Sequence, residues 1–322
     1  MTCRTLEEHY HVKASTLEKQ YKEKLSGYRQ WDQLEHACEW LVFEENMGLR
    51  LAIDETALSN GELHTFVTNR DARCRKGSIV AIIEGTRAED IIRVLERIPE
   101  EKRLAVAEVT MDLSESMRKA VRVAFPNALI VPDRFHIQRE ACEAVQEIRI
   151  RHRWEAIELS NKELERCRKE GRRYEPERFS NGDTRRELLA RSIHLIFKSP
   201  DKWTPTQSQR AQILFREYPD IQKAYSLSHS LRMIFNTAQT PDGARLKLAH
   251  WYKDVEESGF KSFATIANTF RERNRDIVNY FLLRSSNAMA ESFHSQIKLF
   301  RANLRGVADK AFFLFRLANI YA

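Results

Sequence analysis

The chain has 322 residues, 42% of them hydrophobic and 31% charged, with a formal net charge of +7. This composition is typical of a folded protein and excludes a disordered one, and the length allows one large domain or roughly two to three smaller ones. No apolar stretch approaches the ~18 residues of a membrane span, and residues 1–8 lack a signal-peptide core. The five cysteines are too widely spaced for a zinc knuckle. We therefore expect a cytoplasmic protein with reduced thiols, no structural zinc and no membrane association.

Residues 5–25 are expected to form two short helices joined by a turn. Ser15 is a candidate N-cap with Glu18 three residues later, which is the pattern of a capping box. Three apolar residues continue the second helix at a spacing of four: Leu17, Tyr21 and Leu25. The size suits a helix-turn-helix, with Lys19 and Lys22 as phosphate contacts. A small helical hairpin with another role would show the same pattern.

Residues 48–149 have the texture of an α/β fold. A turn signal around Asn60 favours a hairpin between the first two strands. Strands are expected at 51–54, 62–68, 78–83, 104–111 and 128–131, and helices at 88–98 and 114–125. Three antiparallel strands followed by alternating helix and strand is the order of the ribonuclease-H-like fold. In that fold the first and fourth strands lie side by side.

Two of these strands are expected to end in an acid, namely Asp54 and Asp112. A third acid, Glu291, lies far downstream on a helical segment. A buried carboxylate is costly unless it is paired, hydrogen-bonded or bound to a metal. Two strand ends and one helix therefore predict a site for two divalent cations, Mg²⁺ or Mn²⁺, of the kind that cuts and joins phosphodiesters. The alternative is that three of the 46 acids match this arrangement by chance.

Residues 150–284 read as almost wholly helical, with breaks at glycines and prolines, and we interpret them as a helical insertion. The expected organisation has four segments: 1–45, an N-terminal helical segment; 46–150, the first part of the ribonuclease-H-like core; 151–284, the insertion; and 285–322, C-terminal helices that complete the core.

The helix expected from Asn287 to Arg301 has an apolar side formed by Met289, Phe293, Ile297 and Phe300. Glu291 and Lys298 lie on the opposite side, about 20° and ~10 Å apart. Basic residues are frequent from here to the C-terminus, including Arg301 and Arg305. A basic rim around an acidic centre suits a DNA backbone, whereas a solvated basic face and an ordinary amphipathic helix are the alternatives.

The chain resembles the DDE transposases of the ISL3 insertion-sequence family along nearly its whole length. The matching blocks are Ile53-Asp54-Glu55-Thr56, Asn60-Gly61-Glu62 with Thr65, Thr110-Met111-Asp112 with Ser116-Met117, Phe125-Pro126-Asn127-Ala128, Asp133-Arg134-Phe135-His136, Lys202-Trp203, Tyr218-Pro219-Asp220 with Ala224-Tyr225, and Ser286-Asn287 with Ala290-Glu291 and Ile297-Lys298. The most specific are the Asp-Arg-Phe-His block and the Ser-Asn block with its later Glu.

The resemblance implies a transposase that cleaves DNA and transfers strands, with Asp54, Asp112 and Glu291 as catalytic residues and ligands of two Mg²⁺ (or Mn²⁺) ions. Asp54 would bridge the ions. Glu55 and Asp133 are ranked lower as ligands. The implied partners are double-stranded transposon-end and target DNA and further copies of the chain, with association with the nucleoid when DNA is bound.

Two neighbours of Asp133 are further DNA-binding candidates. Asp133 is expected to orient Arg134 or His136, and His136 to contact the scissile phosphate or a flipped base. A histidine that caps a helix is an equal alternative.

One departure from the family concerns the N-terminus. The resemblance implies that full-length relatives carry a zinc-binding domain and a helix-turn-helix ahead of the core. Residues 1–45 of this chain, in contrast, contain no cysteine cluster. Some relatives are split into two reading frames, so a separate N-terminal zinc-binding protein is a candidate partner. Two other functions remain open: a nuclease of the same fold that cuts without joining, and an inactive DNA-binding relic.

Overall fold

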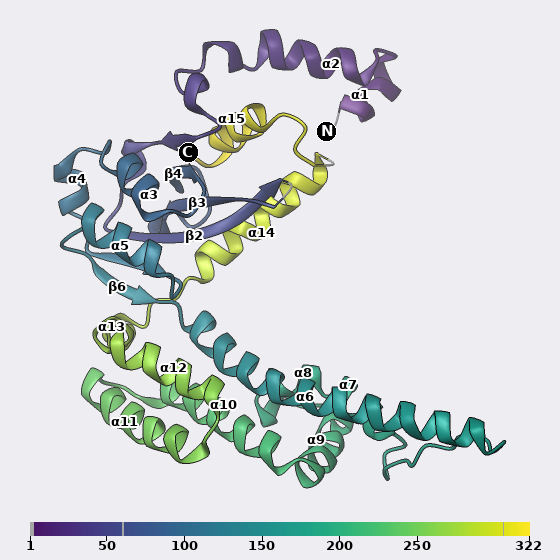
Figure 1. Ribbon diagram of the computed structural model, residues 1–322. Coiled ribbons are helices and arrows are strands. Elements are labelled where there is room, and N and C mark those ends of the chain that lie inside the picture. Colours follow the sequence, from purple (N-terminus) through teal and green to yellow (C-terminus); the bar gives the residue numbers. More distant parts are fainter. Residues whose placement is uncertain (1–2, 60, 305) are drawn as a thin grey trace. The chain divides into compact units, whose positions relative to one another are not determined.

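The computed structural model describes residues 3–59, 61–304 and 306–322. The chain forms two compact units, one of Met1–Asp133 with Ser285–Ala322 and the other of Arg134–Arg284 (Figure 1). The boundary lies between Asp133 and Arg134 and not at residue 150, because residue 150 is inside helix α6, which runs from Arg134 to Lys169. Helical periodicity alone does not mark where one unit ends and the next begins.

A six-stranded mixed sheet forms the centre of the first unit, with strand order β1-β4-β3-β2-β5-β6. The strands are β1 Trp40–Val42, β2 Arg50–Ser59, β3 Glu62–Asn69, β4 Ile79–Glu84, β5 Glu108–Met111 and β6 Leu129–Pro132. The pairs from β1 to β2 are antiparallel, and β2–β5 and β5–β6 are parallel. The expected α/β order is confirmed, and the strand of Asp54 lies beside the strand that precedes Asp112. Asn60 of the expected turn lies outside the described residues.

Two strands differ in length from the prediction. β2 continues to Ser59, so Asp54 lies in its middle, paired with Phe66 on β3, and not at its end. The hairpin with β3 supplies the hydrogen bonds that prolong it. β5 begins at Glu108, because residues Glu100–Leu104 form the short helix α4, with acids in its first turn and bases in its last.

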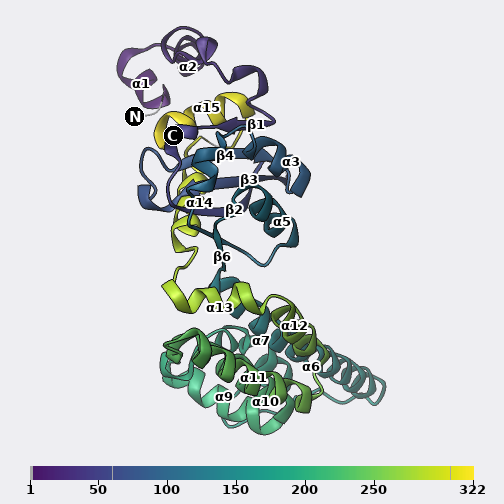
Figure 2. The ribbon, with the colours of Figure 1, turned by 90° about the vertical axis from the view of Figure 1, so that its left-hand side faces the viewer.

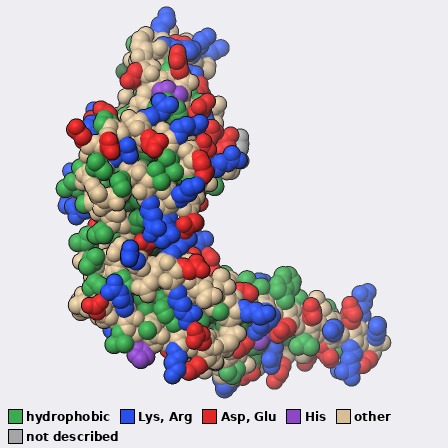
Figure 3. Space-filling model, turned by 60° about the vertical axis from the view of Figure 1, so that its left-hand side comes forward, with side chains coloured by type: hydrophobic (Ala, Val, Ile, Leu, Met, Phe, Trp, Pro, Cys, Tyr) green, Lys and Arg blue, Asp and Glu red, His purple; other side chains and the backbone are tan. Residues whose placement is uncertain are grey.

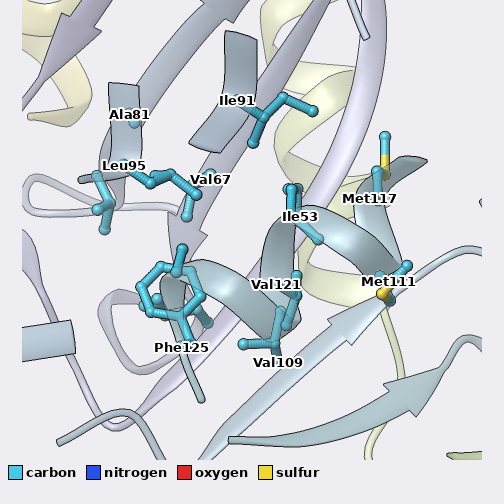
Figure 4. Packing of buried hydrophobic residues seen from close by; sticks show 14 of the residues in the cluster. Ile53, Val67, Ala81, Ile91, Leu95, Val109, Met111, Met117, Val121 and Phe125 are labelled. Atoms are coloured by element: carbon cyan, nitrogen blue, oxygen red, sulfur yellow. The ribbon is translucent and has the colours of Figure 1, made fainter. Parts of the chain in front are cut away.

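The two faces of the sheet are covered by different helices (Figure 2). One face packs against α3 (Ala88–Leu95) and α5 (Glu115–Ala124), and Figure 4 shows Ile53 and Val109 of the sheet among residues of these helices. The other face packs against α14 (Ala288–Asn303) and α15 (Lys310–Tyr321), and its core includes Phe66, the partner of Asp54. Because side chains alternate along a strand, Asp54 lies on the α14 face.

The N-terminal segment contains the two expected helices, α1 (Cys3–Tyr10) and α2 (Ala14–Gln20), the second continued by a π-helical turn to Leu25. The capping box is wrong: Lys13 is the N-cap of α2 and makes no side-chain cap hydrogen bond. The helix begins two residues earlier than expected, which places Ser15 inside its first turn. Leu25, expected on a packed stripe, is 76% exposed.

The second unit is all helical apart from connecting segments and one isolated bridge between Arg178 and Thr184. Its helices are α6 Arg134–Lys169, α7 Arg185–Arg191, α8 Ile193–Ile196, α9 Pro205–Glu217, α10 Pro219–Thr237, α11 Pro241–Ser258, α12 Lys261–Glu272 and α13 Asn274–Leu283. Three of them start with proline, which suits the first helical position because it needs no N–H donor there. No helix in the described parts of either unit is long and apolar enough to span a membrane.

Candidate active site

The register of the sheet brings Asp54 and Asp112 to neighbouring positions. Parallel pairing aligns Ala52 of β2 with Thr110 of β5, and the two acids follow at the same offset on each chain segment. Asp54 is only 7% exposed, whereas Asp112 is partly exposed just beyond the end of β5. Asp112 Oδ1 accepts a hydrogen bond from Ser114 N at 2.8 Å, which fixes the turn into α5.

The Asp54 carboxylate is held by its surroundings on both oxygens. Oδ1 accepts from Glu55 N at 2.8 Å, and Oδ2 accepts from Asn287 Nδ2 at 3.3 Å. His294 Nδ1 lies 3.5 Å from Oδ2. Burial, together with the smaller effect of the nearby Lys298 charge, lowers the pKa of His294 to about 4. His294 is therefore neutral at neutral pH, and it contacts Asp54 as a dipole and not as a cation.

Asn287 joins several elements at this site. Its side-chain Oδ1 accepts from Thr110 Oγ1 at 3.0 Å, and its backbone N–H donates to Asp133 Oδ1 at 3.0 Å. Its carbonyl accepts from Glu291 N at 3.0 Å in the first turn of α14. Neither Asn287 nor His294 was assigned a role from the sequence. The signal that could have found them is their spacing from Glu291, which places all three on one side of the helix.

Glu291 is partly exposed in the first turn of α14, which packs against β2. Of the apolar side, Phe293 and Ile297 are buried as expected. The structure thus places Asp54 on the sheet face that α14 covers, and it places Asp112 directly after the neighbouring strand β5. Within the described residues, however, no three or more His, Cys, Asp or Glu side chains form a group that could hold a metal ion as they stand.

The two candidates that follow Asp133 lie at the start of α6 in the second unit. Arg134 donates to Tyr280 Oη at 3.3 Å and to Asn236 Oδ1, both within that unit. His136 is partly exposed and packs edge-on against Phe135, with ring centroids 6.0 Å apart.

The basic candidates of the first unit divide into two groups. Lys298 and Lys19 are exposed, and Arg301 is partly exposed. Lys22, in contrast, forms an ion pair with Asp309, which ties the N-terminal segment to the start of α15. Arg305 lies outside the described residues. On the face drawn in Figure 3, the described residues include both Lys/Arg and Asp/Glu side chains, which are interspersed over much of it.

Two other basic residues, one before α14 and one after it in the chain, have structural roles. Arg284 donates to the carbonyls of Phe235 and Ala238 within the second unit. Lys310 pairs with Glu62 and Glu84 on the sheet. Among the described residues of α14, Lys298 and Arg301 have exposed surface that can meet a DNA backbone.

Comparison with known proteins gives two matches. Residues 51–317 match the model of the ISL3-type DDE family, which is described as a transposase. The transposase for insertion sequence element IS1001 from Bordetella parapertussis is 23% identical over 273 residues, which are 83% of this chain and 59% of that protein. The chain thus spans about three-fifths of the length of this curated relative.

Proposed function

This chain belongs to the ISL3 family of transposases, and from this premise we propose that it cleaves DNA at the ends of an insertion sequence and joins those ends to target DNA. The observation that carries the proposal is the alignment of Ala52 with Thr110. It supports the proposal because Asp54 on β2 and Asp112, which follows β5, lie two residues beyond this aligned pair, and α14, the helix of Glu291, packs against β2. Carboxylates gathered from three separate elements are what metal-dependent phosphodiester chemistry requires.

The proposed architecture is a ribonuclease-H-like core interrupted by a helical insertion. In its support, the strands from β2 to β4 are consecutive and antiparallel, and β5 and β6 are added in parallel beside β2. The Arg134–Arg284 unit lies in the chain between the second and third acids, Asp112 and Glu291.

We further propose that Asp54, Asp112 and Glu291 hold two Mg²⁺ (or Mn²⁺) ions. The donors fit, since Mg²⁺ prefers carboxylate oxygens and a buried acid such as Asp54 gains most from a bound cation. Two such ions supply an activated nucleophile and stabilise the leaving oxygen of an in-line displacement.

The residues around the carboxylates orient them. Asn287 and Glu55 direct one hydrogen bond each to Asp54, and Ser114 N does the same for Asp112. Glu291 lies in the first turn of α14, where the positive end of the helix dipole favours an anionic side chain.

The proposed DNA contacts are electrostatic. Lys298 and Arg301 extend from the helix of Glu291, and exposed Lys19 lies on α2, so each can neutralise a phosphate. Because an insertion sequence has two ends to be cut and joined together, we propose that the chain acts as a homo-oligomer on DNA. A separate zinc-binding protein is proposed to supply end recognition.

The testing experiment supplies the chain with Mg²⁺, labelled duplexes that carry the ends of the element, and a target plasmid. The transposase proposal expects cleavage that leaves a 3′-hydroxyl, followed by labelled ends joined to the plasmid. Cleavage without joining would instead identify a nuclease. Binding with neither reaction, for wild type and Asp54→Asn alike, would identify an inactive relic.

A further inference from the structure

Asn287 is a fully buried polar residue near the carboxylates, with 0% of its surface exposed, as is its hydrogen-bond partner Thr110. A buried amide is stable only when its polar atoms are hydrogen-bonded. Here its partners come from four elements: Asp54 on β2, Thr110 on β5, Asp133 after β6 and Glu291 on α14. Only the bond to Asp54 acts on a candidate ligand directly, and the others connect Asn287 to the elements around it.

The side chain of Asn287 meets two unlike neighbours. Its Nδ2 donates to the carboxylate of Asp54, which only accepts hydrogen bonds, and its Oδ1 accepts from the Thr110 hydroxyl. An amide supplies a donor and an acceptor on one planar group. A carboxylate at this position would place two negative charges together, and an aliphatic side chain would remove one hydrogen bond from each neighbour.

The backbone of Asn287 fixes the start of α14. Asp133 is the last residue of the first unit before the chain enters the second, and Asn287 follows soon after the chain returns at Ser285. The bond from Asn287 N to Asp133 Oδ1 therefore joins these two chain segments. One turn later, the N–H of Glu291 bonds to the Asn287 carbonyl, so one residue connects the placements of Glu291 and Asp54.

We propose that Asn287 is a positioning residue, which holds the Asp54 carboxylate and the first turn of α14 in fixed relation so that Asp54 and Glu291 bind metal together. This inference rests on the proposed function. A purely structural role would lower stability alone, whereas a positioning role also changes metal affinity.

Asn46 provides a matched control. It is a partly buried asparagine of the same unit, and its Nδ2 donates to the Ile79 carbonyl at 2.7 Å. Both residues thus make an internal amide hydrogen bond, and only that of Asn287 reaches a candidate ligand.

The test compares Asn287→Ala, Asn46→Ala, Thr110→Val and Asp54→Asn in the full chain. Mn²⁺ binding is measured by calorimetry without DNA, and the melting temperature by circular dichroism. The Mg²⁺ midpoint is the Mg²⁺ concentration at which DNA cleavage reaches half of its maximal rate.

Asn287→Ala is expected to weaken Mn²⁺ binding and raise the Mg²⁺ midpoint at least about tenfold, or ~1.4 kcal/mol. Asn46→Ala should lower the melting temperature but change both metal readouts less than about twofold, or ~0.4 kcal/mol. Thr110→Val should weaken Mn²⁺ binding and raise the Mg²⁺ midpoint less than Asn287→Ala does, because Asn287 keeps its bond to Asp54 in this variant.

One outcome would overturn the positioning role and leave the proposed function standing. In it, Asn287→Ala and Asn46→Ala give the same Mn²⁺ affinity and Mg²⁺ midpoint, and Asp54→Asn loses Mn²⁺ binding. Wild-type Mn²⁺ affinity in Asp54→Asn overturns the metal site and this inference with it. If Asn287→Ala does not fold, Asn287→Asp replaces it, because it keeps the shape and the Thr110 contact. This variant should melt at a lower temperature without divalent ions and regain more stability with Mn²⁺ than wild type does. An equal gain in both proteins would count against the positioning role.

Discussion

Ala52 and Thr110 face each other across the parallel pairing of β2 and β5, although strands β3 and β4 and helices α3 and α4 separate the two strands in the chain. This single register pair sets Asp54 and Asp112 at equivalent positions on neighbouring chain segments. A shift of one residue would turn one of the acids toward the opposite face of the sheet. The register is therefore the feature on which the candidate active site most depends.

The variants Asp54→Asn, Asp112→Asn and Glu291→Gln are each expected to lower DNA cleavage at least about a hundredfold, or ~2.7 kcal/mol of activation free energy. Each change removes a metal-binding charge with little change in volume. Single-turnover cleavage in Mg²⁺ measures the effect, and Asp90→Asn, which alters an exposed acid paired with Arg93, is the control. Near-normal cleavage in any one variant would move that ligand role to Glu55 or Asp133.

DNA affinity should fall steeply with salt, and Lys298→Ala and Arg301→Ala should each reduce the slope of log K against log salt by about one unit. Both positions are on the helix of Glu291 and have solvent-exposed surface. Titrations at several salt concentrations measure the slope, with Arg93→Ala on α3 as the control. If both variants kept the wild-type slope, α14 would not contact the phosphate backbone.

Lys22→Ala should release the N-terminal helices without changing the salt slope. Hydrogen bonding to Asp309 raises the pKa of Lys22, so its charge is engaged within the protein. A partly exposed ion pair contributes about 0.5–1 kcal/mol. Hydrogen exchange of residues 3–25 should become faster in this variant, whereas Lys19→Ala should leave exchange unchanged. A slope lowered by about one unit in Lys22→Ala would show that Lys22 contacts phosphate instead.

The chain alone should show little preference for transposon ends. The basic residues of its second helical segment are Lys19, Lys22 and Lys24, which suit phosphates, and arginine, the most frequent reader of guanine, does not occur there. Binding to end and scrambled duplexes in ~150 mM salt should differ less than about a hundredfold, or ~2.7 kcal/mol. Greater discrimination by the chain alone would remove the need for a separate recognition protein.

Asp183→Asn should destabilise the helical unit by about 2–3 kcal/mol, because it breaks a buried charge cluster. Asp183 is 1% exposed and pairs with Arg191 and Arg210. Burial alone would raise its pKa, but hydrogen bonds from both arginines outweigh this and lower it below its usual value.

A carboxylate with a lowered folded-state pKa stabilises the protein above its unfolded pKa of about 3.9, and this contribution is lost as pH falls through the folded value. Thermal melts should therefore show a gap between wild type and Asp183→Asn that is full near pH 7 and closes below about pH 4. A gap of constant size across this range would indicate that the charge of Asp183 does not stabilise the unit.

The sequence by itself determined the order of the elements and the identity of the acids. Alternating and helical spacings are local properties, so the hairpin of β2 and β3, the helices α3 and α5 and the all-helical character of 150–284 could be predicted. The ends of elements were less well predicted. The extension of β2 past Asp54 depends on pairing with β3, and the start of α2 at Ala14 does not follow the cap that its sequence suggested.

Only the tertiary structure decided which residues surround the acids. Asn287 and Asp54 are separated by 233 positions, and Lys22 and Asp309 by 287. No local spacing records such contacts, because they form only after the sheet has closed and α14 has packed on it. The same applies to His294, whose low pKa is caused first by burial. Burial is a property of the folded packing, and it is this packing that turns a row of polar residues on a helix into the surroundings of one carboxylate.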